Sequence, residues 1–221
     1  PKGRPSLRYA SWLLATTDCK LVLRVPVGDT RELGVDRRGE RVAIECAAQA
    51  GLAPQLVYFD DASGLMLSRF VEGRQWQRGE AHDARCVARL AARLRRLHEL
   101  EPPEGARRLE YSTLIADYRR SLAARPEPRT RSSSALDGEA DRRLLSAGAT
   151  ARVQALCHND VHHRNVIEGE SLWLIDWEYA AVGDPLYDLA AFACYHDLDA
   201  IERIGLLEAY APGAAPALTS S

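Results

Sequence analysis

The chain has 221 residues, of which 46% are hydrophobic and 27% charged, the composition of an ordinary globular protein. It contains no run of about 18 uncharged apolar residues, so a membrane-spanning helix is not expected. A formal net charge of −2 gives no general field that would attract nucleic acid or an anionic membrane.

The first 70 residues predict a small antiparallel sheet that carries one helix. Two β-rich runs at 12–16 and 21–25 are separated by a turn, which indicates a hairpin. A helix is expected over 40–50, with Gly51 as its C-cap. Two further β-rich runs between residues 55 and 70 complete the predicted sheet.

Beyond residue 70 the pattern becomes mainly helical. One predicted helix has a buried face at regular spacing, formed by Val87, Leu90, Ala91, Leu94 and Leu97. A second helix is expected over 111–124, followed by a polar loop over 126–134. A hairpin is predicted over 166–175, and a last clear helix begins at Asp184-Pro185.

These elements predict an α+β fold of two lobes. We assign residues 1–70 to a small N-terminal lobe, an antiparallel β-sheet with one helix, and residues 71–221 to a larger, mainly helical C-terminal lobe. The small, featureless residues from 212 onwards follow directly on a helical pattern. We therefore expect the C-terminal lobe to be incomplete.

The stretch 157–165, C-H-N-D-V-H-H-R-N, carries the residues with the clearest chemical meaning. Phosphoryl transfer from ATP needs a carboxylate that orients the attacking hydroxyl, and oxygen ligands that hold Mg²⁺ against the phosphates. Asp160 is predicted to be the catalytic base, and Asn165 follows it at the spacing of the metal-binding Asn in kinase catalytic loops. The hairpin should then return Asp176 to the same place as a second metal ligand.

Each of these residues alone is better explained as an ordinary loop or turn former, and only their combined order is specific. Two alternatives therefore stay open. A metallohydrolase is suggested by His158, His162 and His163, although the helical zinc motif needs Glu where this chain has Asn159. A nucleotide-binding module without catalytic activity is the other, because a fold does not guarantee a function.

Two longer segments, L-C-H-N-D-V-H-H-R-N-V-I and L-I-D-W-E-Y-A-A-V-G-D-P-L-Y-D-L, lie within residues 156–189. They resemble the aminoglycoside phosphotransferase and choline kinase superfamily, and are most similar to bacterial choline kinases and thiamine kinases. The resemblance implies a protein-kinase-like fold with ATP and Mg²⁺ as cofactors. It also implies a cation that holds the ATP phosphates and pairs with a helix glutamate, here mapped to Arg24 and Glu45, with Lys20 as the competing cation.

The resemblance to the family is weaker in the segment that precedes Arg24. Residues 1–7 are a poor version of the family's glycine-bearing phosphate loop, so no loop residue is assigned. The segment 65–73 should cross between the lobes, where its backbone would hold adenine. Asp184 and Asp188 belong to the shared pattern, but a helix N-cap and a favourable first-turn charge explain them.

Charge around the catalytic stretch predicts the kind of acceptor. Ten acidic residues and one basic residue, Arg164, lie between 157 and 202, which favours a small cationic alcohol. Aromatic faces beside a carboxylate attract quaternary ammonium or thiazolium groups, so Trp177 and Glu178 are the candidate substrate contacts, although such rings are also ordinary core residues. Choline and thiamine both fit, and so do aminoglycosides, which makes an antibiotic-resistance phosphotransferase the alternative.

Cysteine usage predicts the location. Five scattered cysteines, without a C-x-x-C pair, indicate a reducing compartment, and no leader-like segment opens the chain. We expect a cytoplasmic enzyme whose partner is a small molecule, with neither nucleic acid nor membrane; the oligomeric state is not predicted.

Overall fold

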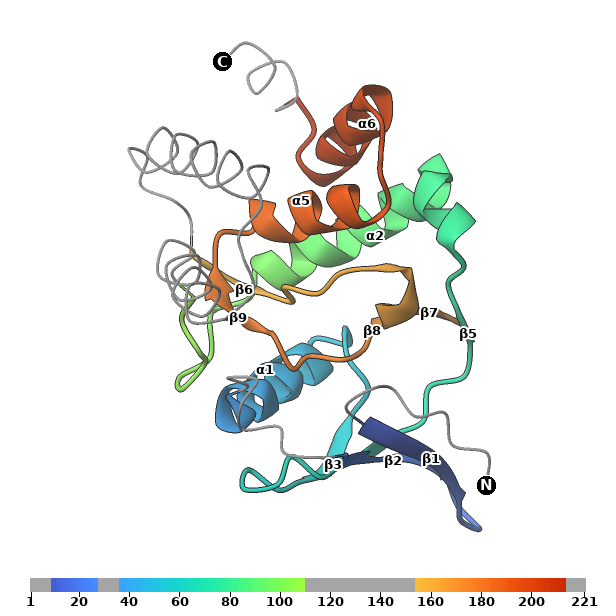
Figure 1. Ribbon diagram of the computed structural model, residues 1–221, viewed down its shortest axis with the longest axis vertical. Helices are drawn as coiled ribbons and strands as arrows, with labels where there is room; N and C mark the ends of the chain where they lie inside the picture. The colour runs from blue at the N-terminus through green and yellow to red at the C-terminus, as the bar shows by residue number, and fades with distance from the viewer. Residues whose placement is uncertain (1–8, 28–35, 110–153, 214–221) are drawn as a thin grey trace, which may run out of the picture.

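The computed structural model describes residues 9–27, 36–109 and 154–213. The N-terminal part is a four-stranded antiparallel sheet in the order β1-β2-β4-β3, with β1 (Tyr9–Ala15), β2 (Lys20–Pro26), β3 (Leu56–Phe59) and β4 (Met66–Arg69). Helix α1 (Arg37–Gln49) lies between this sheet and the rest of the molecule (Figure 1). For the described residues, the predicted antiparallel sheet that carries one helix is confirmed.

The C-terminal part combines short strands with a layer of helices. A three-stranded sheet has the order β5-β7-β8, and a two-stranded one joins β6 to β9. Helices α2, α5 and α6 cover the side away from the N-terminal sheet (Figure 1). The elements are β5 (Arg74–Gln75), η2 (Arg78–His82), α2 (Ala84–His98), β6 (Ala155–Cys157), η3 (His163–Asn165), β7 (Val166–Glu168), β8 (Leu172–Leu174), β9 (Ala181–Gly183), α5 (Leu186–Tyr195) and α6 (Ala200–Tyr210).

Helix α1 begins three residues before the predicted start. The side chain of Asp36 accepts a hydrogen bond from Gly39 N at 3.0 Å, which caps the free amide groups of the first turn. Ala50 is the C-cap, and Gly51, which was predicted there, follows it with φ +70°. A glycine takes this left-handed backbone conformation at little cost, so it ends the helix.

Helix α2 has the buried face that the spacing predicts. Leu90, Ala91, Leu94 and Leu97 are fully buried. The helix packs against α6 and β6, and removing each leucine from water contributes about 1.5–3 kcal/mol. Asp83 caps its N-terminus by accepting from two backbone amides at 2.9 Å.

Of the remaining predicted elements, some are present in the structure and others lie outside the described residues. The hairpin β7-β8 is present. The last predicted helix is present too, but its N-cap is Pro185 and not Asp184, so it begins one residue later than expected, at Leu186; Asp184 Oδ1 still accepts from Leu186 N at 2.9 Å. The predicted phosphate loop over 1–7, the helix over 111–124 and the loop over 126–134 lie outside the described residues. The lobe boundary at residue 70 stays a prediction. Among the described helices, none is long and apolar enough to cross a bilayer.

Candidate active site

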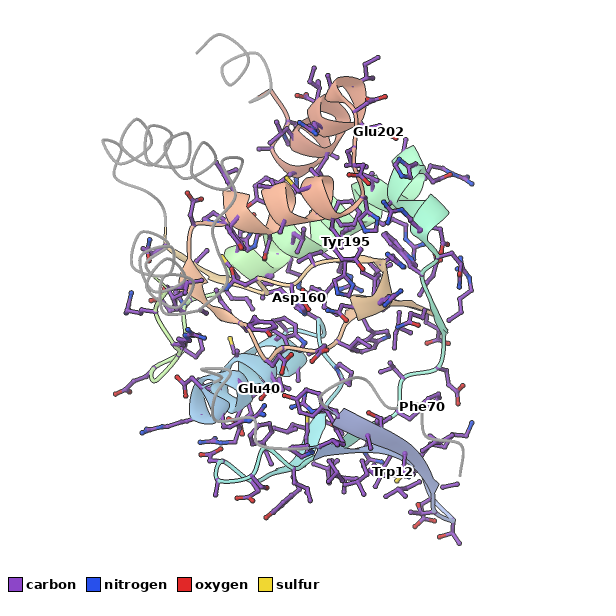
Figure 2. All side chains as sticks on the ribbon, viewed as in Figure 1. Trp12, Glu40, Phe70, Asp160, Tyr195 and Glu202 are labelled. Carbon is purple, nitrogen blue, oxygen red and sulfur yellow. The ribbon has the colours of Figure 1, made fainter. Side chains whose placement is uncertain are left out.

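Asp160 lies on the loop that connects β6 to η3, near the middle of the molecule (Figure 2). Asn165 Nδ2 donates to both the backbone oxygen and Oδ2 of Asp160, each at 2.9 Å. The side chain of Asp160 stays 32% exposed, whereas Asn165 is buried. The predicted base therefore faces solvent while the predicted metal ligand holds it in place.

Asp188, in the first turn of α5, fixes the backbone of this loop. Its buried carboxylate accepts from His158 N at 2.9 Å and from Asn159 N at 2.7 Å. His98 Nε2 donates to the same carboxylate at 3.0 Å. Asn159 has φ +63°, an unfavourable conformation for a residue with a side chain, and these bonds help to hold it.

The function of Asp188 was missed by sequence reasoning, which explained it by its place in the first turn. That place is correct, since Asp188 is an acidic residue of the first turn of α5. Its carboxylate, however, is turned away from water and toward a loop 29 and 30 residues earlier in the chain. The only sequence signal for this contact was that Asp188 belongs to the shared family pattern.

The loop over 158–162, which carries Asp160, is called the catalytic loop below. Asp176 follows β8, and the hairpin returns it to this loop as predicted. Ile175 N donates to Asn165 O at 3.0 Å, which fixes the two segments together. His158 Nε2 donates to Ile175 O at 3.0 Å and adds a second link. Asp176 has φ +65°, so this residue too is held in a sparsely populated conformation beside the predicted site.

The two acidic side chains have opposite electrostatic environments. Burial raises the pKa of Asp176 to about 6; the charge of Arg24 opposes this rise, and the charges of Glu178 and Asp160 add to it. Burial also acts to raise the pKa of Asp160, but interactions with His162 and His158 outweigh it and lower that pKa. Pairs of carboxyl groups whose environments separate their pKa values commonly have different chemical roles.

Arg24 is the buried cation of the N-terminal sheet. Its guanidinium group forms an ion pair with Glu40 of α1 through Nη2, and Nη1 lies 3.5 Å from Asp176 Oδ1. Arg37 Nη1 donates to the other carboxylate oxygen of Glu40 at 2.9 Å. The side chains of Arg24 and Glu40 are 7% and 0% exposed, so this pair is shielded from solvent.

The predicted partner of Arg24, Glu45, is wrong. Glu45 lies on the exposed face of α1 and pairs with Arg41 at 3.2 Å. Each helical residue adds about 100° of rotation, so a glutamate five positions after Glu40 points to another side of the helix. Lys20, the competing cation, pairs with Glu72 on the surface, where its side chain is 53% exposed.

A cleft of about 570 Å³ lies between the sheet and the catalytic loop. Arg24, Asn165 and Asp176 all line it. The segment predicted to cross between the lobes contributes Met66, Ser68, Arg69, Phe70 and Val71. The cleft therefore brings together the crossing segment, the buried cation and both predicted metal ligands.

The two candidate substrate contacts are buried. Glu178 is 6% exposed, and its Oε2 accepts a hydrogen bond from the hydroxyl group of Tyr9. Trp177 is 2% exposed, and its indole Nε1 donates to Leu174 O at 3.0 Å. Trp177 also lines the cleft, but both side chains are committed to contacts inside the protein.

The three histidines of the catalytic stretch do not form a metal cluster. His158 is fully buried, His162 Nε2 lies 3.6 Å from Asp160 Oδ2, and His163 N donates to His196 Nε2. Within residues 9–27, 36–109 and 154–213, one group of three potential metal ligands lies close together, His98, Cys157 and Asp188. The hydrogen bonds of Asp188 explain that group, so the metallohydrolase alternative gains no support.

Much of the local negative charge is neutralised by residues far away in the sequence. Ion pairs join Glu168 to Arg74 and Arg89, Asp197 to Arg78, and Glu202 to His82 if that histidine is protonated. The charge count between 157 and 202 therefore overstates the field. Among the described residues of this segment, Asp160, Asp176 and the nearby Glu178 place negative charge at the site.

The residues present fit a nucleotide and Mg²⁺. Carboxylate and amide oxygens are the ligands that Mg²⁺ prefers, and Asp176 and Asn165 supply them. In the described part of the chain Arg24 Nε is buried without a hydrogen-bond partner, so an anion could use it. A guanidinium group suits phosphate because it offers several donors in one plane.

The N-terminal sheet with Arg24, helix α1 with Glu40 and the loop with Asp160 together form a protein-kinase-like fold. A model of the phosphotransferase enzyme family matches residues 8–219. The chain belongs to that family.

Similar proteins include a protein LicA and a probable choline kinase. The chain is 27% identical over 209 residues to protein LicA of Haemophilus influenzae, covering 90% of this chain and 74% of LicA. It is 27% identical over 182 residues to probable choline kinase 1 of Arabidopsis thaliana, covering 79% of this chain and 51% of the relative, or about half its length.

A solved structure of a choline/ethanolamine kinase family protein from Mesorhizobium loti is also similar, with 28% identity and a TM-score of 0.75. That match covers 87% of this chain and 64% of the solved chain. The chain is therefore similar to proteins of the choline kinase type, and it spans between 51% and 74% of the length of these three relatives.

Proposed function

We propose that the protein transfers the γ-phosphate of ATP to the hydroxyl group of a small cationic alcohol, with choline as the preferred acceptor. The observation that carries this proposal is the hydrogen bond from Asn165 to Asp160, because Asn165 lines the same cleft as Asp176 and Arg24. These are the base, the metal ligands and the phosphate-binding cation that phosphoryl transfer from ATP requires.

Each side chain has a proposed task. Asp160, a carboxylate that is ionised at neutral pH, orients the acceptor hydroxyl and accepts its proton. Arg24 binds phosphate oxygens, and Glu40 holds its guanidinium group in place. Asn165 and Asp176 would hold Mg²⁺, which when bound neutralises charge on the phosphates.

The preference for choline rests on two grounds. Similarity to choline kinases favours choline at low identity, and nothing in the comparisons favours thiamine specifically. The carboxylates of Asp160 and Asp176 favour a cation over an anion near the base. Thiamine and aminoglycosides carry positive charge as well, so they belong in the same experiment.

The test is ADP release from ATP and Mg²⁺ with choline, ethanolamine, thiamine and an aminoglycoside, each at several concentrations. We expect the largest kcat/KM for choline. A larger value for the aminoglycoside would replace choline with an antibiotic as the acceptor. Magnesium-dependent ATP binding without turnover of any acceptor would instead support the non-catalytic nucleotide-binding module.

A further inference from the structure

Tyr9, the first residue of β1, lies where the N-terminal sheet meets the turn that carries Asp176. Its hydroxyl group donates to Glu178 Oε2, 169 residues away in sequence. The hydroxyl oxygen of Tyr9 also accepts a hydrogen bond from Arg37 Nη1 at 2.7 Å. Tyr9 is only 4% exposed, so its hydroxyl group connects two distant segments inside the protein.

The ring of Tyr9 contacts two cations, Arg24 of β2 and Arg37 of α1. The centroid of the ring lies 4.4 Å from Arg24 Cζ and 5.5 Å from Arg37 Cζ, within the range of cation–π attraction. Both arginines also bond to Glu40. Tyr9 is therefore part of the cluster that holds the proposed phosphate-binding cation.

The turn at 176–178 is tied to both parts of the molecule. Asp176 contacts Arg24, and Glu178 accepts from Tyr9, so the residues on either side of Trp177 bond to the N-terminal part. Trp177 itself bonds to Leu174 O and packs against the ring of His158 in the C-terminal part. The bond from Tyr9 thus restrains the position of Asp176 relative to Arg24.

We propose that Tyr9 is a positioning residue, which acts through Glu178 to hold the metal ligand Asp176 at the correct place relative to Arg24. This inference rests on the proposed function, because it assigns Tyr9 to the same nucleotide and metal site. Tyr9 does not need to contact the acceptor for this role. Burial and the hydrogen bond to Glu178 raise the pKa of Tyr9, so the hydroxyl group stays protonated and able to donate.

Tyr9→Phe removes the hydroxyl group and keeps the ring on Arg24. Calorimetry would measure ADP affinity with and without Mg²⁺, in the absence of any acceptor, and the ratio gives the gain due to the metal. We expect this gain to fall about tenfold, as for the loss of a hydrogen bond to a charged group. The matched control is Tyr58→Phe on β3, where Tyr58 is 55% exposed and the ratio should not change.

A double mutant separates this role from a general loss of stability. If Tyr9 acts through Glu178, then Tyr9→Phe combined with Glu178→Ala should reduce the ratio no further than Glu178→Ala alone. Fully additive effects, or an unchanged ratio in Tyr9→Phe, would overturn the inference and leave the proposed function intact. A wild-type protein without magnesium-dependent ADP binding would overturn both.

Discussion

Asn165, next to the catalytic loop, and Arg24 of the N-terminal sheet line the same cleft, but their contacts are determined in different ways. Asp160 and Asn165 are five residues apart and bond directly. The contacts of Arg24 come instead from α1 and from the turn after β8, 16 and 152 residues away. Local spacing therefore encodes the contact between the proposed base and Asn165, whereas the partners of Arg24 are set only when the sheet and helix pack together.

The largest effect on activity is expected from a substitution of Asp160, whose contact with Asn165 is encoded by local spacing. Asp160→Asn keeps the size of the side chain and a group that can accept from Asn165, but it removes the base. We expect kcat to fall roughly 10³-fold, while the affinity for ADP and Mg²⁺ stays nearly unchanged. Steady-state kinetics and calorimetry on the same preparation would measure both.

Asp61→Asn is the matched control for this substitution. Asp61 pairs with Arg41 at 2.8 Å on the surface, and its side chain is 44% exposed. Neither kcat nor nucleotide affinity should change in this control. If Asp160→Asn retained most of its activity, Asp160 would not be the base and the proposed chemistry would need another group.

The second prediction tests the long-range contact of Arg24 with α1 by comparing two glutamates of this helix, Glu40 and Glu45. Glu40→Gln leaves the buried charges of Arg24 and Arg37 without their carboxylate. We expect the free energy of unfolding to fall by about 3 kcal/mol and kcat/KM to fall about 10- to 100-fold. Glu45→Gln should change the unfolding free energy by less than about 0.5 kcal/mol, because exposed ion pairs contribute little.

Chemical denaturation and kinetics on both variants would measure this difference. The two substitutions are chemically identical and lie on the same helix, so helix propensity and purification are matched. Equal effects at the two positions would contradict the assignment of Glu40 as the partner of Arg24. A larger effect of Glu45→Gln would restore the original prediction from sequence.

The regular elements could be predicted because their signals are local. The turn between β1 and β2, the apolar spacing of α2 and the helix start after Asp184-Pro185 each depend on a few neighbouring residues. The same holds for Asp160, Asn165 and the hairpin that returns Asp176. These features follow from short-range sequence patterns, so the fold class and the candidate catalytic groups were accessible before the structure.

The contacts that were missed or wrong depend on tertiary packing. Glu40 and Glu45 are both glutamates on a correctly predicted helix, and only the orientation of α1 against the sheet selects Glu40. Asp188 is correctly placed in its helix, yet the packing of α5 turns its carboxylate toward the catalytic loop. Glu178 likewise bonds to Tyr9, a partner that no local pattern indicates.

The smallest expected effect is a change of metal affinity with pH, which depends on the carboxyl group of Asp176, the residue that contacts Arg24. Its pKa of about 6 means that it should be roughly three-quarters protonated at pH 5.5 and almost fully ionised at pH 7.5. A cation must displace that proton to bind. Metal affinity should therefore be roughly fourfold weaker at pH 5.5 than at pH 7.5.

Water-proton relaxation during a titration with Mn²⁺, used as a paramagnetic substitute for Mg²⁺, would measure this affinity without nucleotide. The raised pKa also sets the sign of a stability effect. Between about pH 4 and pH 6 the folded metal-free protein binds more protons than the unfolded chain, so the contribution of Asp176 to stability falls as pH rises through that window. Asp176→Asn should flatten both profiles, because the amide does not titrate. If the wild-type affinity for Mn²⁺ were constant from pH 5.5 to 7.5, the carboxyl group of Asp176 would not be a ligand that titrates near pH 6.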